Sequence, residues 1–387
     1  MSQTPVSHPP PAPAENITAI DHFERSYRKS RERLLTSIHS ISKTHSVLID
    51  SRAIPEPGPD GETLATDFVI IGARKPRRAL VISSGTHGVE GFAGSAIQHD
   101  FLENRIAGLS LPADTAIIII HANNPFGFAW LRRVSANNID INRNFMTSFD
   151  SNQVSADYQA LFNVLNPTDL NPEPEALRWA ELERFMETNG VARTQKAITE
   201  GQYHYPKGMQ FGGQQHDPCV TNLLSLVGEH LASAEQVLWI DIHTGLGEFG
   251  ACEMISGLPA DHQNFKTASQ VWPETVSAAS GDSLSSPLHG ILDLGMSRAV
   301  PPDCEFGMVF PEFGTYPVDR VVRAMRADNW LHQHGPEDVL LDPAARAVKA
   351  ELLEAFRPDN PQWRSAVQIK GRQFIEQGLT ALAISNG

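Results

Sequence analysis

The chain of 387 residues has little cysteine and no long hydrophobic run. Its three cysteines, Cys219, Cys252 and Cys304, form neither a CxxC motif nor a paired framework, which indicates a reducing compartment and buried or incidental thiols. No apolar stretch approaches the length of a membrane span, and the first residues contain neither the basic nor the apolar region of a secretory signal. We therefore expect a cytoplasmic protein without a membrane partner.

Basic residues are scarcer than acidic ones, with 31 Lys and Arg against 45 Asp and Glu and a formal net charge of -14. This balance argues against nucleic acid as a partner, although acidity on this scale is also an ordinary solubility feature. At 41% hydrophobic and 20% charged residues, the composition is that of a globular protein with a sizeable core. The sequence has no G-x-S-x-G motif, which argues against a serine hydrolase.

Composition and periodicity predict the domain organisation. Residues 1–15 are rich in Pro and Ala and are expected to form a disordered tail. Residues 16–387 are expected to form a single catalytic domain that begins with an amphipathic helix from Ile17 to about Ile41. Within it, we predict a largely helical insertion over 150–235 and C-terminal helices over 318–387.

Apolar runs followed by a polar residue and glycine recur along the chain and predict buried strands. The clearest runs are Ala79–Ile82, Ile117–Ile120, Val237–Ile242 and Phe306–Phe310. A strand, a helix and a strand in succession predict a parallel pair with a right-handed crossover. The polar residues that follow the strands should therefore gather at one edge of the sheet, where ligands bind in open α/β folds. They are His87 and Glu90, Asn124, His243 and Glu312.

His87 and Glu90 are three positions apart, a spacing at which an imidazole and a carboxylate can bind one divalent ion. HxxE alone is a weak signal, because the chain repeats it in a polar segment at His334 and Glu337. A loop histidine beside a glutamate at a helix start is the alternative. Buried histidines and carboxylates need partners, and one cation would satisfy His87, Glu90 and His243 together. These donors suit Zn²⁺, while Co²⁺ or Mn²⁺ would fit the same set.

Glu312 is expected to lie beside the metal rather than on it. A carboxylate there would act as general base for a water whose pKa the metal lowers towards about 7, and would then protonate the leaving amine. The alternative is that Glu312 caps a helix that starts near Pro317. The polar segment Arg132–Phe145 carries three arginines, whose fork of donors suits a carboxylate or a developing oxyanion. On spacing alone, a solvated loop accounts for this segment equally well.

Five motifs together resemble the zinc carboxypeptidase (M14-type) superfamily, and most closely the DUF2817 branch of M14-like metallopeptidases. They are Thr86–Gly91, Asn124–Gly127, Asp140–Phe145, Asp241–Gly245 and Glu312–Gly314. The run Ala129–Arg133 and the aromatic, Gly-rich loop Tyr203–Gly213 also resemble that branch, and the resemblance covers about residues 65–325. It implies an α/β fold with a mixed, twisted sheet of about eight strands and helices on both faces.

The resemblance also implies roles for individual residues. The zinc ligands would be His87, Glu90 and His243. Arg133 would polarise the scissile carbonyl, Asn142 and Arg143 would bind the terminal carboxylate of the substrate, and Glu312 would be the catalytic glutamate. No tyrosine clearly matches the mobile tyrosine of digestive carboxypeptidases. Tyr203, Tyr205 and Tyr316 are the candidates.

Three functions follow in order of support. The first is a zinc-dependent hydrolase that removes a C-terminal residue from a peptide or a small acylated amino acid with a free carboxylate. The second is a deacylase of N-acyl amino acids, as in the aspartoacylase and succinylglutamate desuccinylase branch. The third is a non-catalytic module that binds a metal or a peptide on a hydrolase scaffold.

Overall fold

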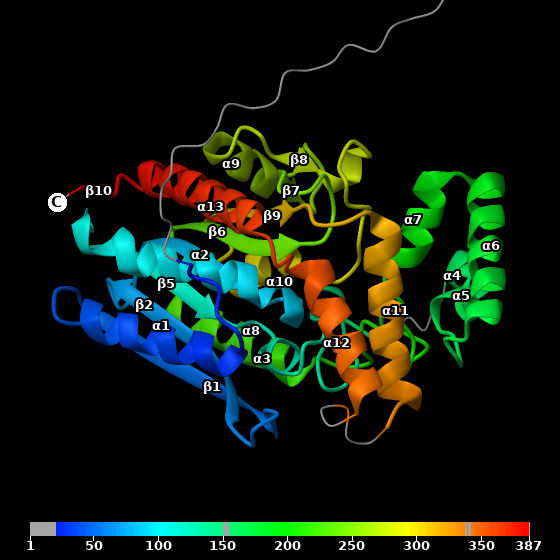
Figure 1. Cartoon of the computed structure of the whole chain (residues 1–387). Coiled ribbons are helices and arrows are strands. Elements are labelled where there is room, and N and C mark those ends of the chain that lie inside the picture. The colour runs from blue at the N-terminus through cyan, green and yellow to red at the C-terminus, as the bar shows by residue number, and fades with distance from the viewer. Residues whose placement is uncertain (1–20, 150–154, 337–338, 340–341, 387) are drawn as a thin grey trace, which may run out of the picture.

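The computed structural model describes residues 21–149, 155–336, 339 and 342–386, and it is built around an eight-stranded sheet (Figure 1). The strand order is β1-β2-β5-β3-β6-β9-β7-β8. The strands are β1 Val47–Pro57, β2 Thr63–Gly72, β3 Arg78–Ser84, β5 Thr115–His121, β6 Gln236–Thr244, β7 Cys252–Ser256, β8 Val276–Ser277 and β9 Glu305–Phe313. A separate pair joins β4 Leu109–Ser110 to β10 Ser385–Asn386. The predicted tail over 1–15 lies outside the described residues.

The centre of the sheet is parallel and its flanks are antiparallel. β5, β3, β6 and β9 run in one direction, so that Ile82 of β3 lies between Ile119 of β5 and Ile240 of β6. β1 pairs with β2, β2 with β5, and β7 with β9 in antiparallel register. The predicted crossover from β3 to β5 is confirmed, and the carboxyl ends of four strands share one edge of this mixed sheet.

Helices cover both faces, as predicted, because successive residues of the apolar strands point to opposite sides. Ile82 and Ile240 face a layer formed by α1 Tyr27–Ile41, α2 Gly91–Asn104, α9 Gln263–Val271 and α13 Pro361–Ala381. Val81 and Trp239 face α8 Pro218–His230 and α10 Leu292–Ala299. None of the described helices is long and apolar enough to cross a membrane.

The predicted insertion is largely helical, and most of it projects beyond one end of the sheet. It contains α4 Ala156–Ala160, α5 Phe162–Leu165, α6 Pro172–Asn189 and α7 Val191–Thr199, which lie on the far side of α11 Val318–His334 (Figure 1). α11 packs in turn beside α12 Pro343–Phe356. The last helix of the predicted segment, α8, packs on the sheet instead. Residues 150–154 are outside the described part of the chain.

The first helix is shorter than its apolar periodicity predicts. It begins at Tyr27, because the Ser26 side chain accepts a hydrogen bond from the Lys29 backbone N–H and caps the helix. Residues 21–26 are not helical although Phe23 is buried, and residues 17–20 lie outside the described residues. The apolar spacing of the sequence therefore extends before the start of α1, because Phe23 is buried without being helical.

Candidate metal centre

The loop after β3 carries two of the predicted metal ligands and is held by backbone contacts. His87 precedes a short 3-10 helix, η1 Gly88–Glu90, and α2 follows directly. The N–H groups of Gly88 and Val89 donate to carbonyl oxygens of the neighbouring loop, at 3.1 Å and 2.8 Å. Gly88 also lies against Gly127 in α3 Pro125–Ala129, where a Cβ on Gly88 would come within 2.1 Å of the Gly127 carbonyl carbon. This close approach fixes the loop from which His87 and Glu90 project.

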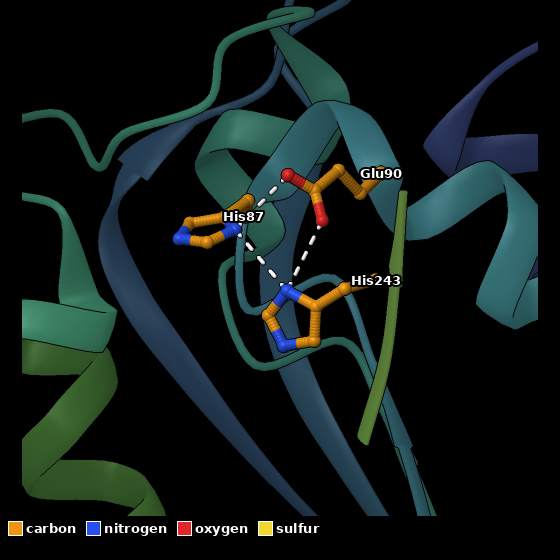
Figure 2. A group of neighbouring side chains, drawn as sticks. All are labelled: His87, Glu90 and His243. Atoms are coloured by element: carbon orange, nitrogen blue, oxygen red, sulfur yellow. Dashed lines mark hydrogen bonds and ion pairs between the residues drawn. The ribbon is translucent and has the colours of Figure 1, made fainter. Parts of the chain in front are cut away.

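The structure brings the three predicted ligands together at the edge of the sheet (Figure 2). His87 Nδ1 lies 3.0 Å from Glu90 Oε1, and His243 Nδ1 lies 3.2 Å from Glu90 Oε2. The two Nδ1 atoms are 3.3 Å apart. All three side chains are buried, and His243 comes from β6, the strand next to β3. Two imidazole nitrogens and a carboxylate thus converge on one point.

A second carboxylate binds the outer nitrogen of each imidazole. His87 Nε2 is 3.1 Å from Asp140 Oδ1 and 2.8 Å from Arg133 Nη2, and His243 Nε2 is 2.6 Å from Asp241 Oδ2. Asp241 is fixed in turn by the hydroxyls of Thr86 and Ser83, which both donate to it. Metal-binding histidines are commonly oriented in this way by carboxylates. The residues present therefore fit a small divalent cation such as Zn²⁺.

The electrostatics of this cluster favour a positive charge at its centre. Burial alone would raise the pKa of Glu90, but His87, His243 and Arg133 together lower it. Burial would likewise lower the pKa of His243, yet Asp241 and Glu90 raise it to about 10. The imidazole thus retains a proton because carboxylates surround it. A bound cation would replace that positive charge, since metal binding displaces ligand protons.

Glu312 lies beside the three predicted ligands and is not part of their group. It is directly opposite His243 in the register of β9 and β6, and its Oε1 accepts a hydrogen bond from the Leu246 N–H at 2.9 Å. Burial and the neighbouring Glu90 charge raise its pKa to about 7. Among the described residues, Glu312 accepts its hydrogen bond from Leu246 and none from the first turn of α11, so the alternative role as a helix cap does not apply.

Both predicted arginines reach the same site. Arg133 lies between α3 and η3 Ile141–Arg143, and Arg143 is the last residue of η3. The Nη1 of Arg133 donates to Glu90 Oε1 at 2.8 Å. Arg143 donates to the Thr199 carbonyl through Nε and Nη2, at 3.1 Å and 2.7 Å, and to the Asn142 carbonyl through Nη1 at 3.0 Å. Asn142 and Arg143 are buried, so this part of the segment is not a solvated loop.

A cavity of about 750 Å³ opens onto these groups. Six of the predicted site residues line it: His87, Arg133, Asn142, Arg143, His243 and Glu312. Glu90 lies behind the lining and contacts both histidines and Arg133.

Asn124 and the candidate tyrosines, which the sequence also singles out, do not line the cavity. Asn124 caps α3 by accepting a hydrogen bond from the Gly127 N–H. Among the described residues, no tyrosine lines the cavity, and the Tyr203 hydroxyl donates to the Arg143 carbonyl at 2.7 Å. In the second HxxE copy, Glu337 is outside the described residues.

A family model described as "Protein of unknown function (DUF2817)" matches residues 23–370. The chain belongs to the DUF2817 family. This confirms the branch predicted from the motifs, and the match extends beyond residues 65–325 in both directions. No curated protein matches this DUF2817 member at a significant level.

Solved structures with a similar arrangement come from both groups that the sequence resembles. Carboxypeptidase A from Helicoverpa armigera is 14% identical, with a TM-score of 0.48 over 93% of this chain and 73% of that one. A succinylglutamate desuccinylase from Silicibacter sp. TM1040 is 12% identical, with a TM-score of 0.41 over 88% and 68%. An aspartoacylase family protein from Mesorhizobium loti is 15% identical, with a TM-score of 0.35 over 76% and 68%. Similarities this distant do not establish an activity for this chain.

Proposed function

We propose that this DUF2817 protein is a zinc-dependent amide hydrolase of the carboxypeptidase type. Its substrate would be a peptide or a small acylated amino acid with a free carboxylate. The observation that carries the proposal is the buried convergence of His87, Glu90 and His243, with each outer imidazole nitrogen on a carboxylate. Amide hydrolysis requires a metal site, a general base and donors for the developing oxyanion. The cavity offers the triad for the first, Glu312 for the second and Arg133 for the third.

Each residue would have a distinct role in the reaction. Zn²⁺, when bound, supplies Lewis-acid activation of the carbonyl and of the attacking water. Glu312 accepts the proton of that water and later donates it to the leaving amine. Arg133, whose guanidinium already reaches Glu90, donates to the carbonyl oxygen as negative charge develops on it.

Asn142 and Arg143 would bind the substrate carboxylate. A guanidinium has five N–H donors. Backbone carbonyls take three of those of Arg143, and Asp140 Oδ2 lies 3.8 Å from its Nη1, so at most two donors are left for a ligand. Arg143 is buried at the cavity wall, where a charge-assisted pair with a carboxylate is strong because water is excluded.

The experiment compares two glutamates of the same strand. Glu312→Gln should retain zinc but lose about 10²- to 10⁴-fold in kcat/KM on a panel of C-terminally free peptides and N-acyl amino acids, because the general base is gone. Glu305→Gln, at the exposed start of β9, should behave like the wild type. Elemental analysis should find zinc in both variants and none in His87→Ala. If Glu312→Gln stays within about tenfold of the wild type, Glu312 is not the base.

The same panel separates the second candidate, a deacylase of N-acyl amino acids. The carboxylate-binding pair, Asn142 and Arg143, supports both candidates, because both kinds of substrate carry a free carboxylate. A higher kcat/KM for N-acyl amino acids than for peptides would select the deacylase. Bound zinc without turnover of any amide would instead favour the non-catalytic module.

A further inference from the structure

The cavity has an apolar wall that the proposed reaction does not use. We call this wall the apolar chamber, and it is formed by Leu182 and Met186 on α6, Val191 and Ile198 on α7, and Val318 on α11. Trp179 of α6 also lines the cavity, and the guanidinium of Arg323 lies 3.7 Å from the centre of its ring. α6 and α7 belong to the segment that projects beyond the sheet (Figure 1). The chamber is therefore built by helices outside the layers that carry the metal ligands.

Several large apolar side chains of this cavity are exposed. Val191 is 67% exposed, Val318 58%, Leu284 41% and Met186 37%. They are four of the nine large hydrophobic residues that are exposed in the described part of the chain. Single exposed apolar residues are common, but a concentration of them around one cavity indicates a ligand or partner that covers them.

The chamber is continuous with the proposed carboxylate site. Arg143 is bonded to the carbonyl oxygen of Thr199, the last residue of α7. From Thr199 the lining residues run back along α7 to Val191, its first residue. At a rise of about 1.5 Å per residue this wall is about 12 Å long. A ligand held at Arg143 by its carboxylate can thus extend an apolar group along α7.

We propose that the substrate is a carboxylate-bearing amide with a large apolar group that occupies the apolar chamber. This inference rests on the proposed function and specifies its substrate class. The apolar group is either a long acyl chain or a large apolar side chain of the residue that is released. A cavity of about 750 Å³ is in the usual range for ligands of this size.

Two substrate series test the proposal and distinguish the two sources of the apolar group. In the first, the acyl chain of N-acyl glycine is lengthened from acetyl to dodecanoyl. In the second, the side chain of an N-acetyl amino acid is enlarged from glycine to phenylalanine. We expect kcat/KM to rise about two- to fourfold per added methylene in one series, until the chamber is filled. A flat response in both series would overturn the proposal.

Variants of the wall provide a matched control. In the series that responds, Met186→Gln/Val191→Gln should lower the ratio of kcat/KM for the longest over the shortest substrate at least tenfold. Leu177→Gln removes a leucine of α6 that is 69% exposed and does not line the cavity, and it should leave that ratio unchanged. An equal loss in both variants would contradict an occupied chamber.

Calorimetric binding separates this proposal from the proposed function. Glu312→Gln protein should bind N-dodecanoyl glycine or N-acetyl phenylalanine, according to the responding series, at least tenfold more tightly than N-acetyl glycine. If neither series is hydrolysed by the wild type, both larger ligands are measured. Tighter binding of one of them without turnover supports the chamber and overturns only the hydrolase. Equal binding of all three overturns the chamber even if amides are cleaved.

Discussion

Asp140 and Asp241 hold the outer nitrogens of the two imidazoles, so the inner Nδ1 atoms face each other and Glu90. A carboxylate in this position fixes the ring orientation and makes the imidazole a stronger donor to a cation. Asp241 also accepts hydrogen bonds from Thr86 and Ser83, so its own position is fixed. The geometry of the triad thus depends on two acids that lie outside the proposed metal site.

Replacing one of these acids should weaken metal binding. We expect Asp241→Asn to reduce zinc affinity about 10- to 100-fold, because the amide orients His243 less strongly and removes a negative charge. The measurement is a competition titration with a chromophoric chelator. Asp114→Asn is the control, since Asp114 binds Arg78 at 2.8 Å, outside the cavity and away from both groups of side chains that could hold a metal. Unchanged affinity in Asp241→Asn would show that the contact does not support the site.

The sequence predicts the positions of these side chains better than their orientations. His87, Glu90, His243 and Glu312 could be predicted as neighbours because they lie at the ends of apolar strands, and strand order alone brings those ends together. The carboxylate that binds each imidazole could not be predicted, because it depends on how the ring is rotated. Asn124 stands at a strand end as well, yet it caps a helix because its side chain turns back to the Gly127 N–H.

Short strands escaped prediction for a physical reason, whereas long elements did not. β3, β5 and β6 contain continuous apolar runs, so their positions could be predicted to within about two residues. β7 has five residues and β8 has two, too few for a hydrophobic period to emerge. The helix between β3 and β5, expected from the strand-helix-strand order, is α2, although its residues from Gly91 to Leu102 are all buried and form no polar face.

Gly88 lies in the loop that carries His87 and Glu90, and its contact with α3 leaves no room for a side chain. Gly88→Ala should lower both zinc content and thermal stability, because the new methyl group would overlap the Gly127 backbone and push the loop away. Elemental analysis and thermal unfolding measure the two effects. Gly228→Ala is the control, since Gly228 is an exposed helical residue with no atom within 4 Å of the added Cβ. Wild-type zinc content in Gly88→Ala would show that the loop tolerates the displacement.

The molecule as a whole contains a buried polar cluster remote from the cavity, between α1, α2 and β5. Ser30 is within hydrogen-bond distance of His99 Nε2 and His121 Nε2, and the Nδ1 atoms of both histidines have no hydrogen-bond partner among the described residues. Burial lowers the pKa of His121 to about 4 and, with the nearby His121, that of His99 to about 2. Both rings are therefore neutral in the folded protein at neutral pH.

This cluster should make the fold sensitive to acid. The pKa of His121 is lower in the folded state than the 6.5 of an unperturbed histidine, so the unfolded chain binds more protons below that pH. The stability contributed is complete above about pH 6.5 and is lost as the pH falls towards 4. In His121→Gln, the loss of unfolding free energy between pH 7 and pH 5 should be about 2 kcal/mol smaller than in the wild type.

Urea unfolding of the metal-free protein at both pH values measures this difference, and the comparison within each variant cancels any loss of stability at neutral pH. His39→Gln is the control, because His39 is exposed on the same α1 that carries Ser30. An identical pH dependence in His121→Gln and the wild type would mean that His121 is already protonated in the folded state or remains accessible to water.

Arg143 is bonded to a backbone carbonyl at the end of α7, and that bond does not depend on which side chains α7 carries. The amino acids along the helix can therefore diversify while the arginine stays in place. Proteins of this family could evolve towards new substrates by exchanging the outward positions of one helix. An engineer could graft a different α6–α7 hairpin onto the scaffold, provided that its last turn still presents an oxygen to the guanidinium.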